Sequence, residues 1–219
     1  MFTRVEVVGH GRLGSAVHAR LAQRGVAADG PDADLVVLCV PDRVIHEVAQ
    51  GIPQGPWIAH MSGAVSLSAL SPHSQRFGLH PLQTFTIGSG PEQFDGAFGA
   101  VTAESDTARA RARWLAACLN LRPFDLAEDK RVLYHAGATM ASNFLVTLYR
   151  ASQRLVEAAG ASADGLLPLM QGTIDNGFEL TGPISRGDWA TVDAHLSAIR
   201  DAAPELEELY RAMARATRP

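Results

Sequence analysis

The sequence predicts an α/β domain followed by an all-helical segment, and two observations support this. Residues 1–125 alternate between short apolar runs typical of strands and segments with helical spacing, whereas residues 126–219 contain helical patterns only. We therefore expect one domain over residues 1–125 and a second over residues 126–219. A chain of 219 residues is long enough for one sizeable core or for two modest domains of about 100 residues each.

The first half begins with an apolar strand over residues 4–9, followed by a helix over 13–24 with an apolar face. Gly25 then stands where a C-terminal cap is expected. Residues 34–40 form a continuous apolar run of the kind buried on both faces of a parallel sheet, and a helix is expected over 43–50. Further elements are the strands in WIAHMSGA, RFGLHP, GAFGAVTA and LRPFDL and an Ala- and Arg-rich helix over 105–119.

The second half is predicted to contain only helices. Residues 129–159 form one long apolar-periodic segment that Gly160 ends. A second helix is expected over 164–180 and a third over 188–202, and Pro204 opens a fourth. The first of these helices contains HAGATMAS, a run of small residues that suits close approach of another helix or of a ligand.

Composition and charge exclude several classes of protein. Apolar residues make up 47% and charged residues 19% of the chain, which is typical of a globular protein. The net charge of −4, from 19 Lys and Arg against 23 Asp and Glu, comes without a dense basic run, so we expect no nucleic-acid partner. A small molecule is the expected ligand.

The sequence also predicts a cytoplasmic protein with no membrane partner. The longest apolar run, ADLVVLCVP, is too short to cross a bilayer, and no basic-then-apolar leader precedes the first strand. Cys39 and Cys118 lie in apolar stretches, so reduced core thiols are expected. The CxxC and HExxH spacings that indicate metal sites do not occur, and no metal is expected.

A G-x-G-x-x-G turn directly follows the first strand and opens the first helix. Gly9 would permit the tight turn, Gly11 would let the backbone approach phosphate oxygens, and Gly14 would let the helix pack close to the strand. This context favours a dinucleotide-binding turn over a merely structural one. Arg12 would either pair with a phosphate or remain solvated. The predicted cofactor-binding residues are Gly9, His10, Gly11, Arg12, Leu13, Gly14, Val40, Pro41, Asp42, His60, Ser62 and Gly63.

The segment after the first helix departs from a complete dinucleotide-binding fold. Such a fold continues with a second strand ending in Asp or Glu at the adenosine ribose, then a helix and a third strand. Here only GVAADGPDA lies before the strand at 34–40, whereas a parallel crossover needs about a dozen residues or more. Asp29 ends a possible stub of the second strand and would accept the ribose hydroxyls. The adenosine half of the pocket is therefore doubtful.

Polar residues follow two strands in the first half. His60, Ser62 and Gly63 fall where a parallel strand ends, the edge at which open α/β sheets bind ligands, although a turn with a hydrogen-bonded His is an equal alternative. His80 is expected to end the strand in GLHPLQTF, and its neutral imidazole, with a pKa near the working pH, could move a proton. The alternative is a structural His at the domain junction. Gln83, in the same segment, is a predicted substrate contact.

The segment TGPISRGD joins two helices in the second half. Arg186 supplies a planar cation suited to a substrate carboxylate, or it bridges to Asp175 or Asp193. Asp188 is placed to cap the helix that follows.

These motifs together resemble one known family, the Rossmann-like proteins with the C-terminal domain called DUF2520, which are relatives of pyrroline-5-carboxylate reductase and ketopantoate reductase. The resemblance implies a Rossmann-like domain, here with a truncated second β-α-β segment, and an all-α domain that forms homodimers. It also implies NAD(P)-dependent oxidoreductase activity, with NADP slightly favoured over NAD. The matching segments are GHGRLGSA, CVPD, HMSGA, GLHPLQTF, HAGATMASNFLVTL and LTGPISRGDWATVDAHL.

The resemblance also bears on the long helix. Thr139 and Asn143, one turn apart, are predicted to share a face lining the catalytic cleft, with His135 one turn earlier. β-Hydroxyacid dehydrogenases and ketopantoate reductase have a catalytic Lys where this chain has Thr139, and the nearby Lys is Lys130. Polar residues tying helices together in a dimer core are the alternative.

Three hypotheses about function follow. The first is an NAD(P)-dependent oxidoreductase acting on a small, carboxylate-bearing substrate, with His80, Asn143 and Thr139 as catalytic residues and His80, Gln83, Asn143 and Arg186 as substrate contacts. The second is a non-catalytic module that binds a nucleotide or metabolite and has lost the full dinucleotide pocket. The third, a purely structural helical dimer, gives the glycine turn no function.

Overall fold

The computed structural model describes residues 1–28, 30 and 32–217. Two compact units divide the chain, one from Met1 to Thr139 and one from Met140 onward. The last strand ends at Asp125, where we placed the change from α/β to all-helical sequence. A domain boundary at that residue stays a prediction.

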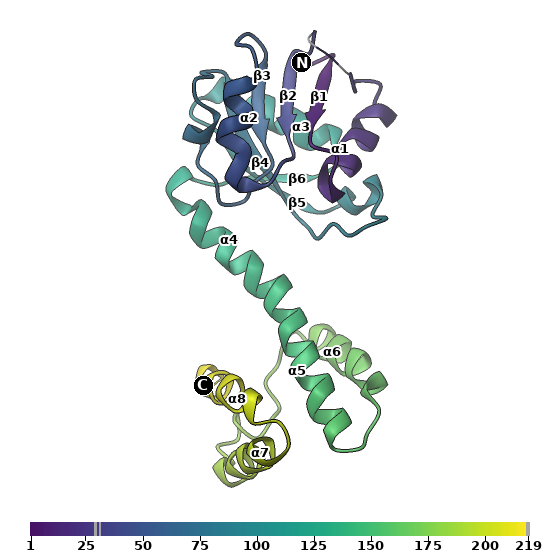
Figure 1. Cartoon of the computed structure of the whole chain (residues 1–219), viewed down its shortest axis with the longest axis vertical. Coiled ribbons are helices and arrows are strands. Elements are labelled where there is room, and N and C mark those ends of the chain that lie inside the picture. The colour runs from purple at the N-terminus through teal and green to yellow at the C-terminus, as the bar shows by residue number, and fades with distance from the viewer. Residues whose placement is uncertain (29, 31, 218–219) are drawn as a thin grey trace. The chain divides into compact units, whose positions relative to one another are not determined.

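The first unit is built on a mainly parallel sheet, which confirms the predicted α/β fold class. In the part of the chain that the structure describes, this sheet has six strands in the order β1-β2-β3-β4-β5-β6 (Figure 1). The strands β1 to β4 run parallel, β4 and β5 are antiparallel, and β5 and β6 are parallel. Their bounds are β1 Val5–Val8, β2 Leu35–Leu38, β3 Trp57–His60, β4 Arg76–Leu82, β5 Phe98–Thr102 and β6 Arg122–Asp125.

Helices cover both faces of this sheet, and the sequence of β2 reflects that. Leu35 and Val37 belong to a core shared with α1 (Arg12–Gln23) and α3 (Asp106–Cys118). Val36 and Leu38 belong to a second core, shared with α2 (Ile45–Gly51) and the 3₁₀ turn Leu67–Leu70. Because successive side chains of a strand point to opposite faces, a strand buried on both faces must be apolar throughout.

The connection after α1 is as short as the sequence predicts. Residues 24–34 join α1 to β2, and Gly25, with φ +71°, ends the helix as expected. Ala27 forms a single parallel bridge with Val5, which is the remnant of a second strand. The described residues of this connection contain no helix. Asp29, the predicted ribose contact, lies outside the described residues.

The rest of the chain is helical, as predicted. In the long segment over 129–159, a π-helical turn, Met140–Phe144, separates two α-helices. The helix predicted over 164–180 was too long, because Gly177 and Phe178 have positive φ and helix α6 ends at Asp175. Asp188 caps the next helix by accepting from the Thr191 amide at 3.2 Å, as predicted. The α-helices are α4 Arg131–Thr139, α5 Leu145–Ala158, α6 Leu166–Asp175, α7 Trp189–Ala202 and α8 Glu207–Ala216.

The second unit buries few side chains. A small core of Val192, Leu196 and Ala214 joins α7 to α8. None of the residues of α5 and α6 is buried. Among the described residues, no helix has both the length and the apolar character needed to span a membrane.

One buried cation fixes the start of α4 to the sheet within the first unit. The Arg131 side chain is 1% exposed. Its Nε donates to the Val65 carbonyl at 2.9 Å, Nη1 donates to Thr102 Oγ1 at 2.7 Å, and Nη2 donates to the Ser62 carbonyl. Burial lowers the Arg131 pKa, and the nearby Glu128 carboxylate opposes that shift. These bonds hold the loop after β3 against both α4 and β5.

Candidate functional site

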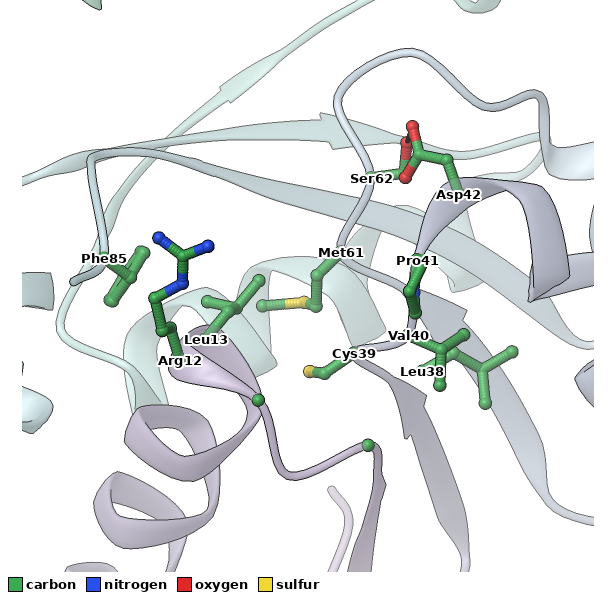
Figure 2. A pocket seen from close by; sticks show the side chains of 12 residues that line it. Arg12, Leu13, Leu38, Cys39, Val40, Pro41, Asp42, Met61, Ser62 and Phe85 are labelled. Carbon is green, nitrogen blue, oxygen red and sulfur yellow. Dashed lines mark hydrogen bonds between the residues drawn. The ribbon is translucent and has the colours of Figure 1, made fainter. Parts of the chain in front are cut away.

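A pocket of about 430 Å³ opens at the carboxyl ends of β1, β2 and β3. This is the edge at which open α/β sheets bind their ligands. Figure 2 shows Met61, Leu13 and Phe85 as apolar groups on one side, and Asp42 and Ser62 facing each other on the other. The lining residues are Gly9, Gly11, Arg12, Leu13, Leu38, Cys39, Val40, Pro41, Asp42, Met61, Ser62 and Phe85. Eight of the twelve predicted cofactor-binding residues are among them, namely Gly9, Gly11, Arg12, Leu13, Val40, Pro41, Asp42 and Ser62.

The three glycines of the turn have different surroundings. Gly9 has φ +100°, and a Cβ there would lie 2.6 Å from the Cys39 carbonyl oxygen. A Cβ at Gly14 would lie 1.7 Å from the Gly9 carbonyl oxygen, so only glycine lets α1 start this close to β1. A Cβ at Gly11 would meet nothing within 4 Å. Gly9 and Gly14 therefore shape the turn, whereas Gly11 leaves open space beside the pocket.

The start of α1 suits an anionic ligand. Gly11 is the N-cap residue, it supplies no side-chain cap, and the first turn contains no acidic residue. The first amides of a helix lack partners within the helix and carry partial positive charge. Arg12 adds an exposed guanidinium, which Figure 2 shows near Phe85. With the open space at Gly11, these groups fit the phosphates of a nicotinamide dinucleotide.

Ser62 organises the opposite wall of the pocket. Its hydroxyl donates to Asp42 Oδ2 at 2.9 Å and accepts from the backbone amides of Ala64 at 3.2 Å and Val65 at 3.0 Å. The hydroxyl is thus fully engaged by its own loop and by Asp42, which follows β2. The Asp42 carboxylate keeps one oxygen outside this bond, and it lines the pocket at the end of β2.

Beside Ser62, a glycine leaves room for a cluster of rings. A Cβ at Gly63 would lie 2.6 Å from His135 Cδ2 and 2.9 Å from His80 Nε2. His80 Nδ1 is hydrogen-bonded to the Tyr134 hydroxyl at 2.9 Å, in a direction set by the histidine tautomer. The His80 ring also meets the His135 ring edge-on at 5.8 Å. Gly63 does not line the pocket, but it joins Ser62 to this cluster.

His80 differs from the expectation in two ways. It does not end a strand, because β4 continues to Leu82 and pairs His80 with Ala100 of β5. Its pKa is not near neutral: burial, followed by the charges of His135 and Arg131, lowers it from 6.5 to about 4. Burial also raises the pKa of Tyr134 to about 12. Both groups are therefore uncharged near pH 7, and together they present a neutral donor and acceptor pair.

His60 is placed in the core and not at the surface of the turn. It is the last residue of β3, its side chain is 0% exposed, and neither ring nitrogen has a hydrogen-bond partner among the described residues. Burial, with the charge of Arg131, lowers its pKa to about 3. His60 cannot touch a ligand from this position, so the expected direct cofactor contact is corrected.

Other predicted site residues have varied surroundings. His10 is exposed and rests edge-on against His18 at 6.0 Å. Gln83 is exposed, and its Oε1 accepts from the Thr84 amide at 2.8 Å. Thr139 ends α4 and Asn143 lies in the π-helical turn, where i→i+5 bonding alters the one-turn spacing we expected.

Arg186 forms a bond within its own loop. Its Nη1 donates to the Thr181 carbonyl, and no ion pair joins it to Asp175 or Asp193 in the described chain. Lys130 is exposed and pairs with Asp129 at 2.9 Å. The described residues contain no group of three or more His, Cys, Asp or Glu side chains that could hold a metal ion. Cys39 and Cys118 are free thiols, and burial raises the pKa of Cys39 to about 12.

Sequence reasoning missed the role of the start of α4. Arg131, Tyr134 and His135 stand at i, i+3 and i+4, the spacing that places side chains on one helix face. That spacing was visible in the sequence, but nothing there indicated that His80 would lie against it. Phe85 and Met61, which line the pocket, were not singled out, although both lie in segments that carry the family resemblance.

The glycine geometry predicts opposite outcomes for two alanine variants. Gly14→Ala should lower the free energy of unfolding by about 1–3 kcal/mol, because its Cβ cannot fit beside the Gly9 carbonyl. Gly11→Ala should change that free energy by less than about 1 kcal/mol, since the position is open and only the N-cap preference changes. Urea unfolding of the three proteins measures both. Equal destabilisation by the two variants would contradict this description of the turn.

The lowered pKa of His80 predicts acid destabilisation. Between pH 6.5 and about 4 the unfolded chain binds a proton at His80 and the folded chain does not, so stability falls as the pH drops through this window. The slope is about 1.4 kcal/mol per pH unit for each such proton. Urea unfolding from pH 7 to 4.5 should show a slope smaller by about this amount in His80→Asn than in the parent. Parallel pH profiles for the two proteins would refute the shift.

The fold resembles those of several solved structures. A candidate NADP oxidoreductase from Bacteroides fragilis is 22% identical with a TM-score of 0.83, over 98% of this chain and 97% of that one. A protein from Thermotoga maritima is 25% identical with a TM-score of 0.74, over 96% and 99% of the two chains. The reductive aminase from Aspergillus terreus, in complex with NADPH and ethyl-5-oxohexanoate, is 18% identical with a TM-score of 0.65, over 100% and 95%.

A search of curated protein sequences found no match. The family described as a domain of unknown function, DUF2520, matches residues 97–217, which is more than half of the chain. This stretch includes β5, α3, β6 and the helical second half. Together with the Rossmann-like sheet and its glycine turn, the match shows that the chain belongs to the DUF2520 family.

Proposed function

We propose that this protein is an NAD(P)-dependent oxidoreductase acting on a small, carboxylate-bearing substrate. The observation that carries the proposal is the open space at Gly11, at the start of α1 and at the edge of a pocket on the carboxyl ends of parallel strands. Backbone amides and Arg12 would face the phosphates there, and the apolar side chains of Leu13, Met61 and Phe85 would offer contacts for a flat ring.

Side chains of the protein would position the cofactor and the substrate and hold a proton. A bound nicotinamide cofactor would supply the hydride acceptor or donor. The Asp42 and Ser62 pair would fix the edge of the ring site, because the two side chains are already joined. His80 and Tyr134, both uncharged near pH 7, would orient a polar substrate group and hold a proton at Nδ1 or at the phenol oxygen. Gln83, Thr139, Asn143 and Arg186 stay proposed catalytic or substrate-binding residues on the sequence pattern.

The similar solved structures support a nicotinamide cofactor. One is described as a candidate NADP oxidoreductase and another is a reductive aminase in complex with NADPH, and both share this fold over nearly the whole chain. A further structure of the same fold, from Cupriavidus necator, contains NAD. We keep NADP as the slightly favoured cofactor, with NAD as the alternative.

A non-catalytic binding module is the second candidate. It is favoured by the short connection after α1 and by the position of Lys130, which is exposed and paired with Asp129, outside the pocket lining. Such a module would bind the cofactor without consuming it. Hydride transfer from bound NADPH to any of a panel of small oxo acids would exclude this reading.

A cofactor titration tests the proposal directly. NADPH and NADH should quench or enhance fluorescence saturably and raise the melting temperature of the protein. Gly11→Asp should weaken binding at least tenfold, because a carboxylate then occupies the space opposite the phosphates. Gly51→Asp, at an open position in α2 away from the pocket, is the matched control and should bind like the parent. No saturable binding at millimolar cofactor would overturn the proposal.

We also propose that the second unit forms a homodimer. Monomers rarely expose large contiguous apolar patches, yet the segment from Met140 to Leu180, which contains α5 and α6, exposes many large apolar side chains. A second copy of the chain offers the same apolar surface in return, as a two-fold interface requires. The exposed residues are Met140, Phe144, Leu145, Val146, Leu167, Leu169, Ile174, Phe178 and Leu180.

A single charge should weaken this dimer. Leu169 is 66% exposed on α6, and Leu169→Glu should raise the dissociation constant at least tenfold because it buries an unpaired carboxylate in the interface. Ile87→Glu is the matched control, since Ile87 is 94% exposed in a loop of the first unit. Sedimentation equilibrium over a concentration series measures both variants. A monomeric parent, or identical behaviour of the two variants, would contradict the dimer.

A further inference from the structure

We infer that the pocket is built for the nicotinamide mononucleotide half of the cofactor and that the adenosine half adds little to binding. The inference rests on the proposed function, because it states which part of the dinucleotide the same site holds. Three observations support it: the residues that line the pocket, the position at which the remnant strand pairs with β1, and the hydrogen bonds that hold the connection after α1.

The lining of the pocket stops at the start of α1. Its residues come from the end of β1, the first turn of α1, the ends of β2 and β3, and Phe85 after β4. In the described part of the connection over residues 24–34, no residue lines it. The pocket therefore extends from the glycine turn toward β2 and β3 only.

The remnant strand pairs at the amino end of β1, whereas adenosine would need support at the carboxyl end. In doubly wound folds an acidic residue at the end of the strand after the first helix binds the adenosine ribose, about 20 residues beyond the glycines. Here Val5 donates to the Val26 carbonyl at 2.8 Å and accepts from the Ala28 amide at 2.9 Å. Val5 begins β1, about 13 Å from Gly9, the first residue of the glycine turn, at the rise of a strand. The remnant thus stays at the edge opposite the ligand.

The end of the connection is tied to that same edge. The Asp34 carboxylate accepts from the amide of Thr3 at 2.8 Å and from that of Arg4 at 3.1 Å. Arg4 Nε also donates to the Asp32 carbonyl at 3.1 Å. These bonds hold residues 32 and 34 at the amino end of β1. The backbone at residues 26–28 and at residues 32 and 34 is therefore held at the amino end of β1. Adenosine would lie at the carboxyl end.

The consequence for affinity is specific. Only groups that leave water for protein contacts add to binding. The nicotinamide, its ribose and the phosphates would meet the lining residues, whereas none of the described residues of the connection lines a place for the adenine and its ribose. The described connection offers no lining to a 2′-phosphate on that ribose either, so any preference for NADPH over NADH should stay within about threefold.

Isothermal titration of the full chain with four probes tests this inference. Reduced nicotinamide mononucleotide should bind with a dissociation constant within about tenfold of that of NADH, a difference below about 1.4 kcal/mol. NADPH and NADH should agree within about threefold, and adenosine, which carries no phosphate for the glycine turn, should not compete with either. A mononucleotide more than tenfold weaker than NADH, or competition by adenosine, would overturn the inference while leaving the proposed function intact. If NADH, NADPH and the mononucleotide all failed to bind, the proposed function would fail as well.

Two variants separate the halves of the ligand. Gly11→Asp should weaken the mononucleotide and NADH by similar factors, because both present a phosphate to the same turn. Ala28→Glu places a negative charge on the remnant strand and should change the dissociation constant of NADPH by less than about threefold. Circular dichroism and the melting temperature without ligand show whether each variant is folded. A larger loss of NADPH affinity in folded Ala28→Glu would mean that adenosine lies over the remnant, and the inference would be wrong.

Discussion

The buried guanidinium of Arg131 is the interaction on which the candidate site depends. Its hydrogen bonds to Ser62, Val65 and Thr102 join α4, β5 and the loop after β3, elements that are far apart in the sequence. That loop supplies Ser62 to the pocket and Gly63 to the histidine cluster. A buried cation is costly unless its donors are satisfied. Burial keeps His60 and His80 neutral, and the charge of Arg131 adds to that effect. One residue therefore contributes to both the shape of the site and its electrostatics.

The parts of the fold that local sequence could predict are those set by neighbouring residues. The continuous apolar run of β2 follows from burial on two faces, and the glycine turn follows from steric demands visible in Gly9 and Gly14. The missing crossover after α1 is a matter of chain length, so counting residues was enough. The pocket residues at the ends of β1 and β2 followed from the rule that ligands bind at the carboxyl edge of such sheets.

The rest depended on contacts between distant residues. The side-chain hydrogen-bond partner of His80 lies 54 residues away along the chain, and the partners of Arg131 lie 29 to 69 residues away. No local sequence pattern reveals such contacts. His60 looked like a surface residue because it precedes a turn, yet the packing of β3 between its neighbours buries it completely. The π-helical turn at Met140–Phe144 also escaped prediction, since a helical period of 3.6 residues continues through the sequence on either side of it.

The short connection after α1 has a consequence for solubility. Without a full second strand, β1 becomes an edge strand whose outer side, among the described residues, is paired at Val5 only. Unpaired edges invite association with strands of other molecules. The bridge at Ala27, the short length of β1 and the charged side chains of Arg4 and Glu6 all blunt this edge. At the opposite edge β6 is protected in another way, by Pro123 between Arg122 and Phe124. Because the crossover is missing, β1 is an edge strand instead of an interior strand, and its sequence must prevent edge-to-edge association.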